Sequence, residues 1–247
     1  MKIRLDKLVF ERGLAPSRER AQALILAGKI LVNGQKVEKS GTSIDADAEL
    51  RLLGEDLKYV SRGGLKLEKA IEHWHIDVAG KVCLDVGAST GGFTDCMLQH
   101  GASRVIAVDT GHGQIDFRFR QDPRVRLLEK TNARYLTREQ VNDDIGLIAI
   151  DVSFISATLV LPAVAAAAFP VSGRGGRQMV VLVKPQFEAG REHVGKGGIV
   201  KDESAQLAAV EKVRQAVTNL GARHTDVIDS PILGAEGNRE FLLYATF

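Results

Sequence analysis

The sequence predicts an α/β protein of two parts: a small α+β domain, then a larger domain on a mostly parallel seven-stranded sheet. Three observations support this. From residue 82 onward, apolar stretches rich in Val, Ile and Leu alternate with stretches of helical period, as in a parallel sheet covered on both faces. An Asn-Gly pair between two short apolar runs marks a hairpin near the N-terminus. The charge of the chain changes sharply within its first part, where a basic stretch is followed by an acidic one.

A basic stretch with an acidic exit marks the first part as a small partner-binding module. Residues 1–40 contain nine Lys and Arg and four acids, whereas residues 41–56 contain five acids and one Arg. We assign residues 1–57 to the first domain, residues 58–61 to a linker and residues 62–247 to the second domain. The local formal charge of +5 over the first 40 residues would attract phosphates, although the whole chain carries only +2.

The composition is ordinary for a globular protein, with 247 residues of which 45% are apolar. The two cysteines, Cys83 and Cys96, are too few for a disulfide framework and lack metal-ligand spacing, so we expect no metal site. The first residues, MKIRLDKLVFERG, contain no uninterrupted apolar segment, which favours a cytoplasmic protein without a signal peptide. Residues 155–171 are mostly apolar but fall short of the ~20 residues of a membrane span, and Pro162 interrupts them.

The first domain is expected to place two helices before a hairpin. Residues 5–12 have a short helical pattern, and Ser17 is a candidate N-cap for a second helix that Gly28 ends. The run KILVNGQKV predicts two strands joined by a tight turn, and a further short strand is expected around residues 50–53.

The second domain is expected to open with a helix from Arg62 to about His73. The last apolar stretch, FLLYATF, follows the preceding strand across a short loop, which predicts an antiparallel pair at the edge of the sheet. We expect strands at 82–87, 104–109, 125–130, 145–151, 179–184, 223–229 and 240–247, and helices near 91–100, 154–168 and 204–220. In the last helix, Leu207, Val210, Val213, Val217 and Leu220 are expected on one face.

The stretch VCLDVGASTGGFTD, residues 82–95, predicts a strand, a glycine turn and the start of a helix. Such glycines let a cofactor approach the backbone, and Asp109, at the end of the next strand, is placed to hold ribose hydroxyls. By itself the turn fits either a dinucleotide or S-adenosylmethionine. Its sequence is G-A-S-T-G-G, and Asp85 precedes it, where a carboxylate would attract an ammonium group and repel a pyrophosphate. These details favour S-adenosylmethionine.

The candidate cofactor-binding residues extend to two later strands. Asn132 could hydrogen-bond an adenine edge, although a turn residue is the other interpretation of this position. The full candidate set is Asp85, Gly87, Ser89, Gly91, Gly92, Asp109, Asn132 and Asp151.

Four ionisable residues stand at positions that suggest chemistry. Asp151 and Lys184 each end a strand, and the carboxyl edge of an open parallel sheet is where ligands bind. Lys66 lies on the first helix of the second domain, and Glu240 begins the last strand. We take these four as the candidate catalytic residues.

The first 50 residues resemble the small RNA-binding domain first seen in ribosomal protein S4. The resemblance rests on Arg4-Leu5-Asp6, on Ser17-Arg18 followed by Ala21 and Gly28, and on Val32-Asn33-Gly34. It implies that basic residues here hold RNA phosphates, and helix starts with Arg side chains suit that role. A solvated charged surface is the other interpretation. The candidate RNA-binding residues are Arg4, Lys7, Arg18, Arg20, Lys29, Asn33, Lys36 and Arg62.

Along essentially the whole chain, LDVGASTGGFTD, IDVSFIS, KPQFEAGRE, GKGGIV and EGNREF resemble the TlyA family of RNA methyltransferases. The resemblance implies an FtsJ-like ribose 2′-O-methyltransferase domain of the Rossmann-like class I fold behind the S4-type domain. It implies a substrate in the ribosomal RNA of ribosomal subunits, and a catalytic tetrad of Lys66, Asp151, Lys184 and Glu240. FtsJ-like enzymes have an acid where this chain has Asn132.

The expected reaction is transfer of a methyl group from S-adenosylmethionine to a ribose 2′-hydroxyl. Our hypothesis makes a neutral Lys184 the proton acceptor, with the two carboxylates orienting the lysines and Lys66 positioning the hydroxyl. Two other function classes stay open from the sequence. A membrane-active, haemolysin-like protein would use residues 155–171, and a dinucleotide oxidoreductase would use the glycine turn alone. The sequence leaves the oligomeric state open.

Overall fold

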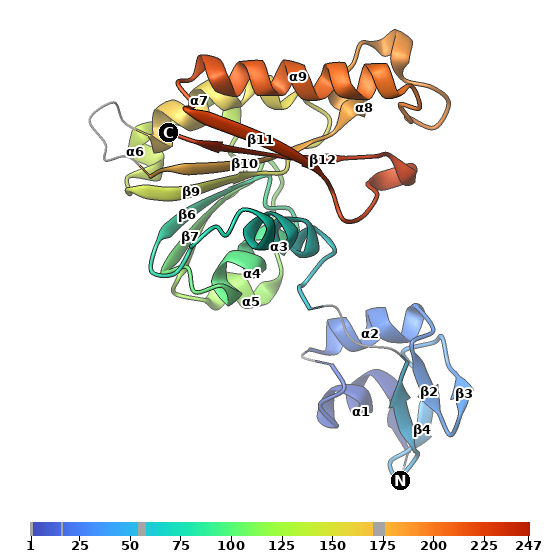
Figure 1. Cartoon of the computed structure of the whole chain (residues 1–247). Coiled ribbons are helices and arrows are strands. Elements are labelled where there is room, and N and C mark those ends of the chain that lie inside the picture. The colour runs from blue at the N-terminus through green and yellow to red at the C-terminus, as the bar shows by residue number, and fades with distance from the viewer. Residues whose placement is uncertain (1, 16, 54–57, 170–175) are drawn as a thin grey trace. The chain divides into compact units, whose positions relative to one another are not determined.

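The computed structural model describes residues 2–15, 17–53, 58–169 and 176–247. The chain divides into two compact units, Met1–Asp56 and Leu57–Phe247, each with its own core (Figure 1).

The first unit packs two helices against short strands. Ser17 caps the second helix, since its hydroxyl accepts a hydrogen bond from the Arg20 N–H at 3.1 Å. Asn33 and Gly34 both have positive φ, +50° and +80°, as a tight two-residue hairpin turn requires. A strand pair near the N-terminus was not predicted, because three-residue strands are too short to show a period. The elements are β1 (Lys2–Arg4), α1 (Leu5–Glu11), α2 (Arg18–Leu26), β2 (Ile30–Val32), β3 (Gln35–Lys36), β4 (Ser43–Asp45) and β5 (Leu50–Leu52).

The second unit is built on the expected seven-stranded sheet, in the order β11-β12-β10-β9-β6-β7-β8. Only β12 runs antiparallel to its neighbours, and it lies between β10 and the edge strand β11. Its first residue is therefore at the same edge of the sheet as the last residues of the parallel strands. The strands are β6 (Val82–Val86), β7 (Arg104–Val108), β8 (Val125–Leu128), β9 (Ile145–Ile150), β10 (Gln178–Val183), β11 (His224–Asp229) and β12 (Phe241–Thr246).

Helices cover both faces of this sheet. Alternate residues of the central strand β6 enter different cores: Cys83 packs with α3 and α4 on one face, and Leu84 packs with α7 and α9 on the other. The buried faces are apolar, as expected of parallel strands covered on both sides. The helices are α3 (Gly63–His73), α4 (Gly92–Gln99), α5 (Phe117–Gln121), α6 (Arg138–Val141), α7 (Leu161–Ala168), α8 (Pro185–Glu188) and α9 (Glu203–Asn219), with short 3₁₀ turns η1 (Ala133–Tyr135), η2 (Ala157–Leu159), η3 (Arg191–His193) and η4 (Ala235–Gly237).

Two of the expected helices differ from expectation in detail. The helix expected over 154–168 begins only at Leu161, after the 3₁₀ turn η2, and the part of the chain that the structure describes contains no helix long and apolar enough to cross a membrane. In α9, Val210, Val213 and Val217 are buried as expected, but the side chain of Leu207 is exposed, and small Ala205 and Ala209 are buried instead.

The segment expected to be a linker packs on the second unit. Tyr59 is buried, and its ring lies so close to Gly64 that a Cβ there would be 2.3 Å from the Tyr59 Cγ. The Tyr59 hydroxyl donates to Glu68 at 2.7 Å, and the Val60 N–H donates to the Asp95 carboxylate at 2.8 Å. An aromatic ring seated on a glycine of α3 therefore fixes how the chain enters this unit.

Candidate active site

Two neighbouring cavities open at the carboxyl edge of the sheet. The larger, of about 520 Å³, is lined by the residues that follow β6, β7, β8 and β9, and its volume lies in the range of small-molecule sites. The smaller, of about 240 Å³, is lined by the start of α3, the glycine turn and residues 232–234. Gly87, Ser89 and Asp151 line both cavities.

The glycine turn passes directly under the end of β9. Gly87 has φ +88°, and a Cβ there would lie 2.3 Å from the Asp151 carbonyl oxygen, so only glycine allows this approach. Ser89 and Gly92 line the cavities, whereas Gly91 lines neither and packs against the ring of Phe119. The turn therefore forms a wall common to both cavities.

Asp109 is held rigidly at the larger cavity. The Ser89 N–H donates to one carboxylate oxygen at 2.8 Å and the Gly111 N–H donates to the other at 2.6 Å. Asn132 also lines this cavity, and its side-chain oxygen accepts the Arg134 N–H at 3.1 Å. Asn132 is thus both a turn-capping residue and a cavity-lining residue. Sequence reasoning did not single out Gln114, whose side chain carries both hydrogen-bond donors and acceptors, on the same wall.

Asp85 is fully buried beneath the turn and lines neither cavity. One of its oxygens accepts the Thr94 hydroxyl at 2.6 Å, and the other has no hydrogen-bond partner among the residues that the structure describes. Burial raises the pKa of Asp85 to about 7, although the Thr94 hydrogen bond opposes this rise. An unpaired buried carboxylate oxygen is the kind of group that a cationic ligand would satisfy.

The four candidate catalytic residues form two ion pairs at the smaller cavity. The Lys66 Nζ lies 2.5 Å from the Glu240 Oε2, and the Lys184 Nζ lies 2.5 Å from the Asp151 Oδ1. Lys66 and Asp151 line the cavity, and each forms an ion pair with a partner behind it, Glu240 for Lys66 and Lys184 for Asp151. The cluster is formally neutral, which makes its partly buried charges tolerable.

Ser153 is a further residue of this cluster that sequence reasoning did not single out. Its hydroxyl accepts a hydrogen bond from the Lys184 Nζ at 2.8 Å, so Lys184 has two oxygen partners on the segment after β9. The only sequence signal was its place two residues after Asp151.

A buried carboxylate braces the two strand ends that carry Asp151 and Lys184. Glu188, at the end of α8, accepts the Ser156 hydroxyl at 2.5 Å and the Ala157 N–H at 2.6 Å. The Lys212 Nζ lies 3.4 Å from the same carboxylate. Glu188 thereby ties the segment after β9 to the segment after β10. Its sequence signal was an acid only four residues after Lys184.

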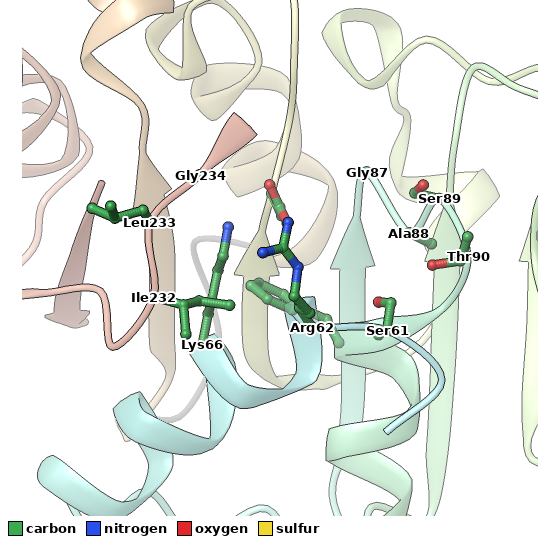
Figure 2. Close-up of a pocket in the computed structure, with 14 residues that line it drawn as sticks. Ser61, Arg62, Lys66, Gly87, Ala88, Ser89, Thr90, Ile232, Leu233 and Gly234 are labelled. Atoms are coloured by element: carbon green, nitrogen blue, oxygen red, sulfur yellow. The ribbon is translucent and has the colours of Figure 1, made fainter. Parts of the chain in front are cut away.

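Arg62 extends beside Lys66 toward the smaller cavity. Figure 2 shows both side chains reaching from the start of α3 into the space between the glycine turn and residues 232–234. Within the described parts of the chain, no carboxylate forms an ion pair with Arg62, which leaves its guanidinium available to an anion.

In the first unit, two candidate RNA-binding arginines converge on a buried acid. Arg4 and Arg18 each donate to the carboxylate of Asp6 at 3.0 Å, and Gln22 donates to it at 2.8 Å. The Arg4 hydrogen bond is the largest cause that holds the pKa of Asp6 well below its usual range. Both arginines still expose about half of their side chains, 53% and 47%, so they combine a folding role with a surface charge.

The other candidates of this unit are scattered over its surface. Lys7 and Lys36 are exposed and Lys29 is half-buried, while Arg20, the third residue of α2, donates its backbone N–H to the Ser17 cap. Asn33 also has a structural role, because its side-chain oxygen accepts a hydrogen bond from the Glu49 N–H at 2.9 Å.

Comparison with known proteins gives the same division of the chain. The family model of the S4 domain matches residues 3–50, and the model of the FtsJ-like methyltransferase matches residues 59–247. The chain is 42% identical over 242 residues to the 16S/23S rRNA (cytidine-2′-O)-methyltransferase TlyA of Mycobacterium tuberculosis, covering 98% of this chain and 88% of that one. It is also 42% identical over 243 residues to Hemolysin A of Brachyspira hyodysenteriae, covering 98% and 99% of the two chains.

A solved structure of a related protein resembles this chain over nearly its whole length. A Streptococcus thermophilus protein described as a hemolysin is 45% identical, with a TM-score of 0.73, and the match covers 99% of this chain and 88% of that one.

Proposed function

Because this chain belongs to the TlyA family, in which an S4 domain precedes an FtsJ-like methyltransferase domain, we propose that it methylates a ribose 2′-hydroxyl of ribosomal RNA. It is an S-adenosylmethionine-dependent methyltransferase, and this membership excludes the dinucleotide oxidoreductase. One observation supports the reaction above all: two lysine–carboxylate pairs meet at a cavity next to a cofactor-sized one.

The larger cavity fits S-adenosylmethionine. Asp109, fixed by two backbone N–H groups, would hold the ribose hydroxyls, and Asn132 would bond the adenine edge. Asp85, beneath the glycine turn with one unpaired oxygen, would attract the cationic amino group of the methionine part, although it lines neither cavity and direct contact would require the turn to shift. When bound, the cofactor supplies a methyl group that its positive sulfur activates for transfer.

Lys184 and its partners prepare the acceptor hydroxyl. A ribose 2′-hydroxyl is a poor nucleophile at neutral pH, so a neighbouring base that takes its proton contributes about 10²–10⁴-fold. Asp151 and Ser153 hold the Lys184 Nζ from one side, which leaves one position of the neutral amine for the hydroxyl proton. Orientation is the larger contribution, about 7–11 kcal/mol in well-aligned cases.

Lys66 and Glu240 complete the acceptor side. Glu240 is almost fully buried and fixes the Lys66 ammonium at the cavity wall, where that group can position the ribose. Arg62, beside it, is suited to an RNA phosphate, because a guanidinium binds phosphate through a planar fork of donors.

The first unit would anchor the substrate. Its exposed basic residues and its S4 family match support binding of ribosomal RNA within a ribosomal subunit, largely through phosphates. An enzyme that modifies ribosomal subunits works in the cytoplasm, and we propose that location for this chain.

The decisive experiment is transfer of labelled methyl groups from S-adenosylmethionine to purified ribosomal subunits, followed by mapping of the modified nucleotide. The wild-type chain is expected to label a ribose 2′-oxygen. Lys184→Ala is expected to lower turnover at least about 10²-fold while calorimetry shows unchanged cofactor binding. Label on a base, or near-normal turnover of Lys184→Ala, would overturn the corresponding part of this proposal.

A further inference from the structure

The connection between α8 and α9 is rich in glycine and basic residues, and the site described above does not use its cations. Its residues 190–201, GREHVGKGGIVK, contain three cations and one acid, a formal charge of +2, and the acid Asp202 follows as the N-cap of α9. We call this segment the basic loop. Its cations Arg191, Lys196 and Lys201 are exposed, and no carboxylate of the described chain forms an ion pair with them.

The base of the basic loop is held firmly by buried side chains. Asn238, only 3% exposed, accepts the Val200 N–H at 3.2 Å and donates to the Gly198 carbonyl at 3.0 Å. Gln206, on α9, donates to the Val200 carbonyl at 2.7 Å. Because no carboxylate of the described residues pairs with Arg191, Lys196 or Lys201, ion pairing within the fold does not account for these cations on a firmly held loop.

The tip of the basic loop is open to a ligand. The Gly195 N–H donates to the Ile199 carbonyl at 2.9 Å and closes a tight turn. Gly197 and Gly198 both have positive φ, and in the described residues no atom beyond their chain neighbours lies within 4 Å of the position that a Cβ would take. Two exposed glycines beside Lys196 allow a phosphate to reach the backbone as well as the ammonium group.

The basic loop adjoins the acceptor side of the active site. Asn238 lies two residues before Glu240, and its carbonyl accepts the Gly234 N–H at 2.8 Å. Gly234 lines the smaller cavity and lies so close to Glu240 that a Cβ would be 2.0 Å from its Oε1. In Figure 1 the orange connection between α8 and α9 and the red connection between β11 and β12 lie on the same side of the second unit.

We propose that the basic loop binds phosphates of the RNA strand next to the target nucleotide and so holds that strand over the Lys66–Glu240 pair. This inference rests on the proposed function, because it assigns a contact for the same substrate. The two parts of the protein then have different tasks. The first unit anchors the RNA, and the basic loop positions the reacting nucleotide.

Charge removal tests the proposal directly. Lys196→Ala and Lys201→Ala, singly and together, are compared with wild type for binding to purified ribosomal subunits at several KCl concentrations and fixed magnesium. Each phosphate contact that is lost should lower the slope of log affinity against log salt by about 0.7–0.9. We expect each variant to raise KM for the subunits about 3- to 10-fold with kcat and cofactor affinity unchanged.

Arg223→Ala is the matched control. Arg223 is exposed, forms no ion pair within the described residues, and precedes β11 at the opposite edge of the sheet. The Arg223→Ala substitution therefore removes one positive charge without changing the basic loop. If Lys196→Ala changes the salt slope no more than Arg223→Ala does, the basic loop does not bind phosphate. A fall in kcat with KM unchanged would also overturn the proposal, because it would indicate a role in the reaction.

The binding measurement does not depend on turnover, so the two proposals can fail separately. If the wild type binds subunits and Lys196→Ala lowers the salt slope, but no methyl group is transferred, only the proposed reaction falls. If methyl transfer occurs and the slopes of all variants agree, only the basic loop proposal falls.

Discussion

Asp85→Asn is expected to stabilise the second unit, by an amount that grows as the pH rises. Asp85 is fully buried, accepts one hydrogen bond from Thr94 at 2.6 Å and leaves its other oxygen unpaired within the described chain. Asparagine has nearly the same shape, and its oxygen can still accept the Thr94 hydroxyl. The substitution therefore removes the cost of a buried charge and little else.

The magnitude follows from the pKa of Asp85, which burial raises from 3.8 to about 7. The unfolded chain releases this proton near pH 4, whereas the folded chain keeps it until about pH 7, so stability falls as the pH rises between these values. Each pKa unit corresponds to about 1.4 kcal/mol, which makes the whole effect about 4 kcal/mol. Between about pH 5 and pH 8 the wild type should lose about 3 kcal/mol relative to Asp85→Asn.

Urea unfolding measured by the fluorescence of Trp74 is the appropriate assay. Trp74 is the single tryptophan and stacks on Tyr244 at 5.0 Å, so its emission reports the second unit. The quantity to compare is the free energy of unfolding of the variant minus that of the wild type, at about pH 5 and at about pH 8. The titration of other groups, such as the histidines, affects both proteins equally and cancels in this difference. Asp144→Asn, whose carboxylate is 80% exposed, should show the same difference at both values. An Asp85→Asn difference that is equally constant would refute the reasoning.

The same variant separates stability from cofactor binding. If the unpaired oxygen of Asp85 meets the amino group of S-adenosylmethionine, Asp85→Asn should bind the cofactor more weakly at pH 8 even though it unfolds later. Calorimetry at pH 8 measures this, and unchanged affinity would place Asp85 outside the cofactor contacts.

Two other buried carboxylates give predictions of opposite kind. Asp6→Asn should destabilise the first unit by about 3 kcal/mol, because it removes the negative charge shared by Arg4 and Arg18 and keeps only one acceptor oxygen for them. In the wild type this contribution should be lost as the pH falls below about 4, and hydrogen exchange of the first unit measures both effects. Glu188→Gln should cost about 1–3 kcal/mol in Trp74-monitored unfolding, since only one of its two donors keeps an acceptor, whereas exposed Glu211→Gln should change less than about 0.5 kcal/mol.

Local patterns were sufficient for the sheet and for half of the candidate catalytic cluster. Continuous apolar strands predict a parallel sheet, and the sequence placed Asp151 and Lys184 at strand ends on its carboxyl edge. In the structure these two strands are neighbours, and the two side chains form an ion pair. The short helices α5, α6 and α8 escaped prediction because four or five residues show no helical period.

Other contacts depend on packing between distant segments. The sequence by itself determined which candidate residues stand at strand ends, the glycine turn and the basic N-terminal module, because each of these depends on local composition and spacing. Only the tertiary structure decided that Tyr59 seats on Gly64, that Arg4 and Arg18 share Asp6, and that Asp85 lies below the cavities. It also joined Lys66 to Glu240 across 174 residues, because the reversed strand β12 carries its first residue to the edge where the parallel strands end.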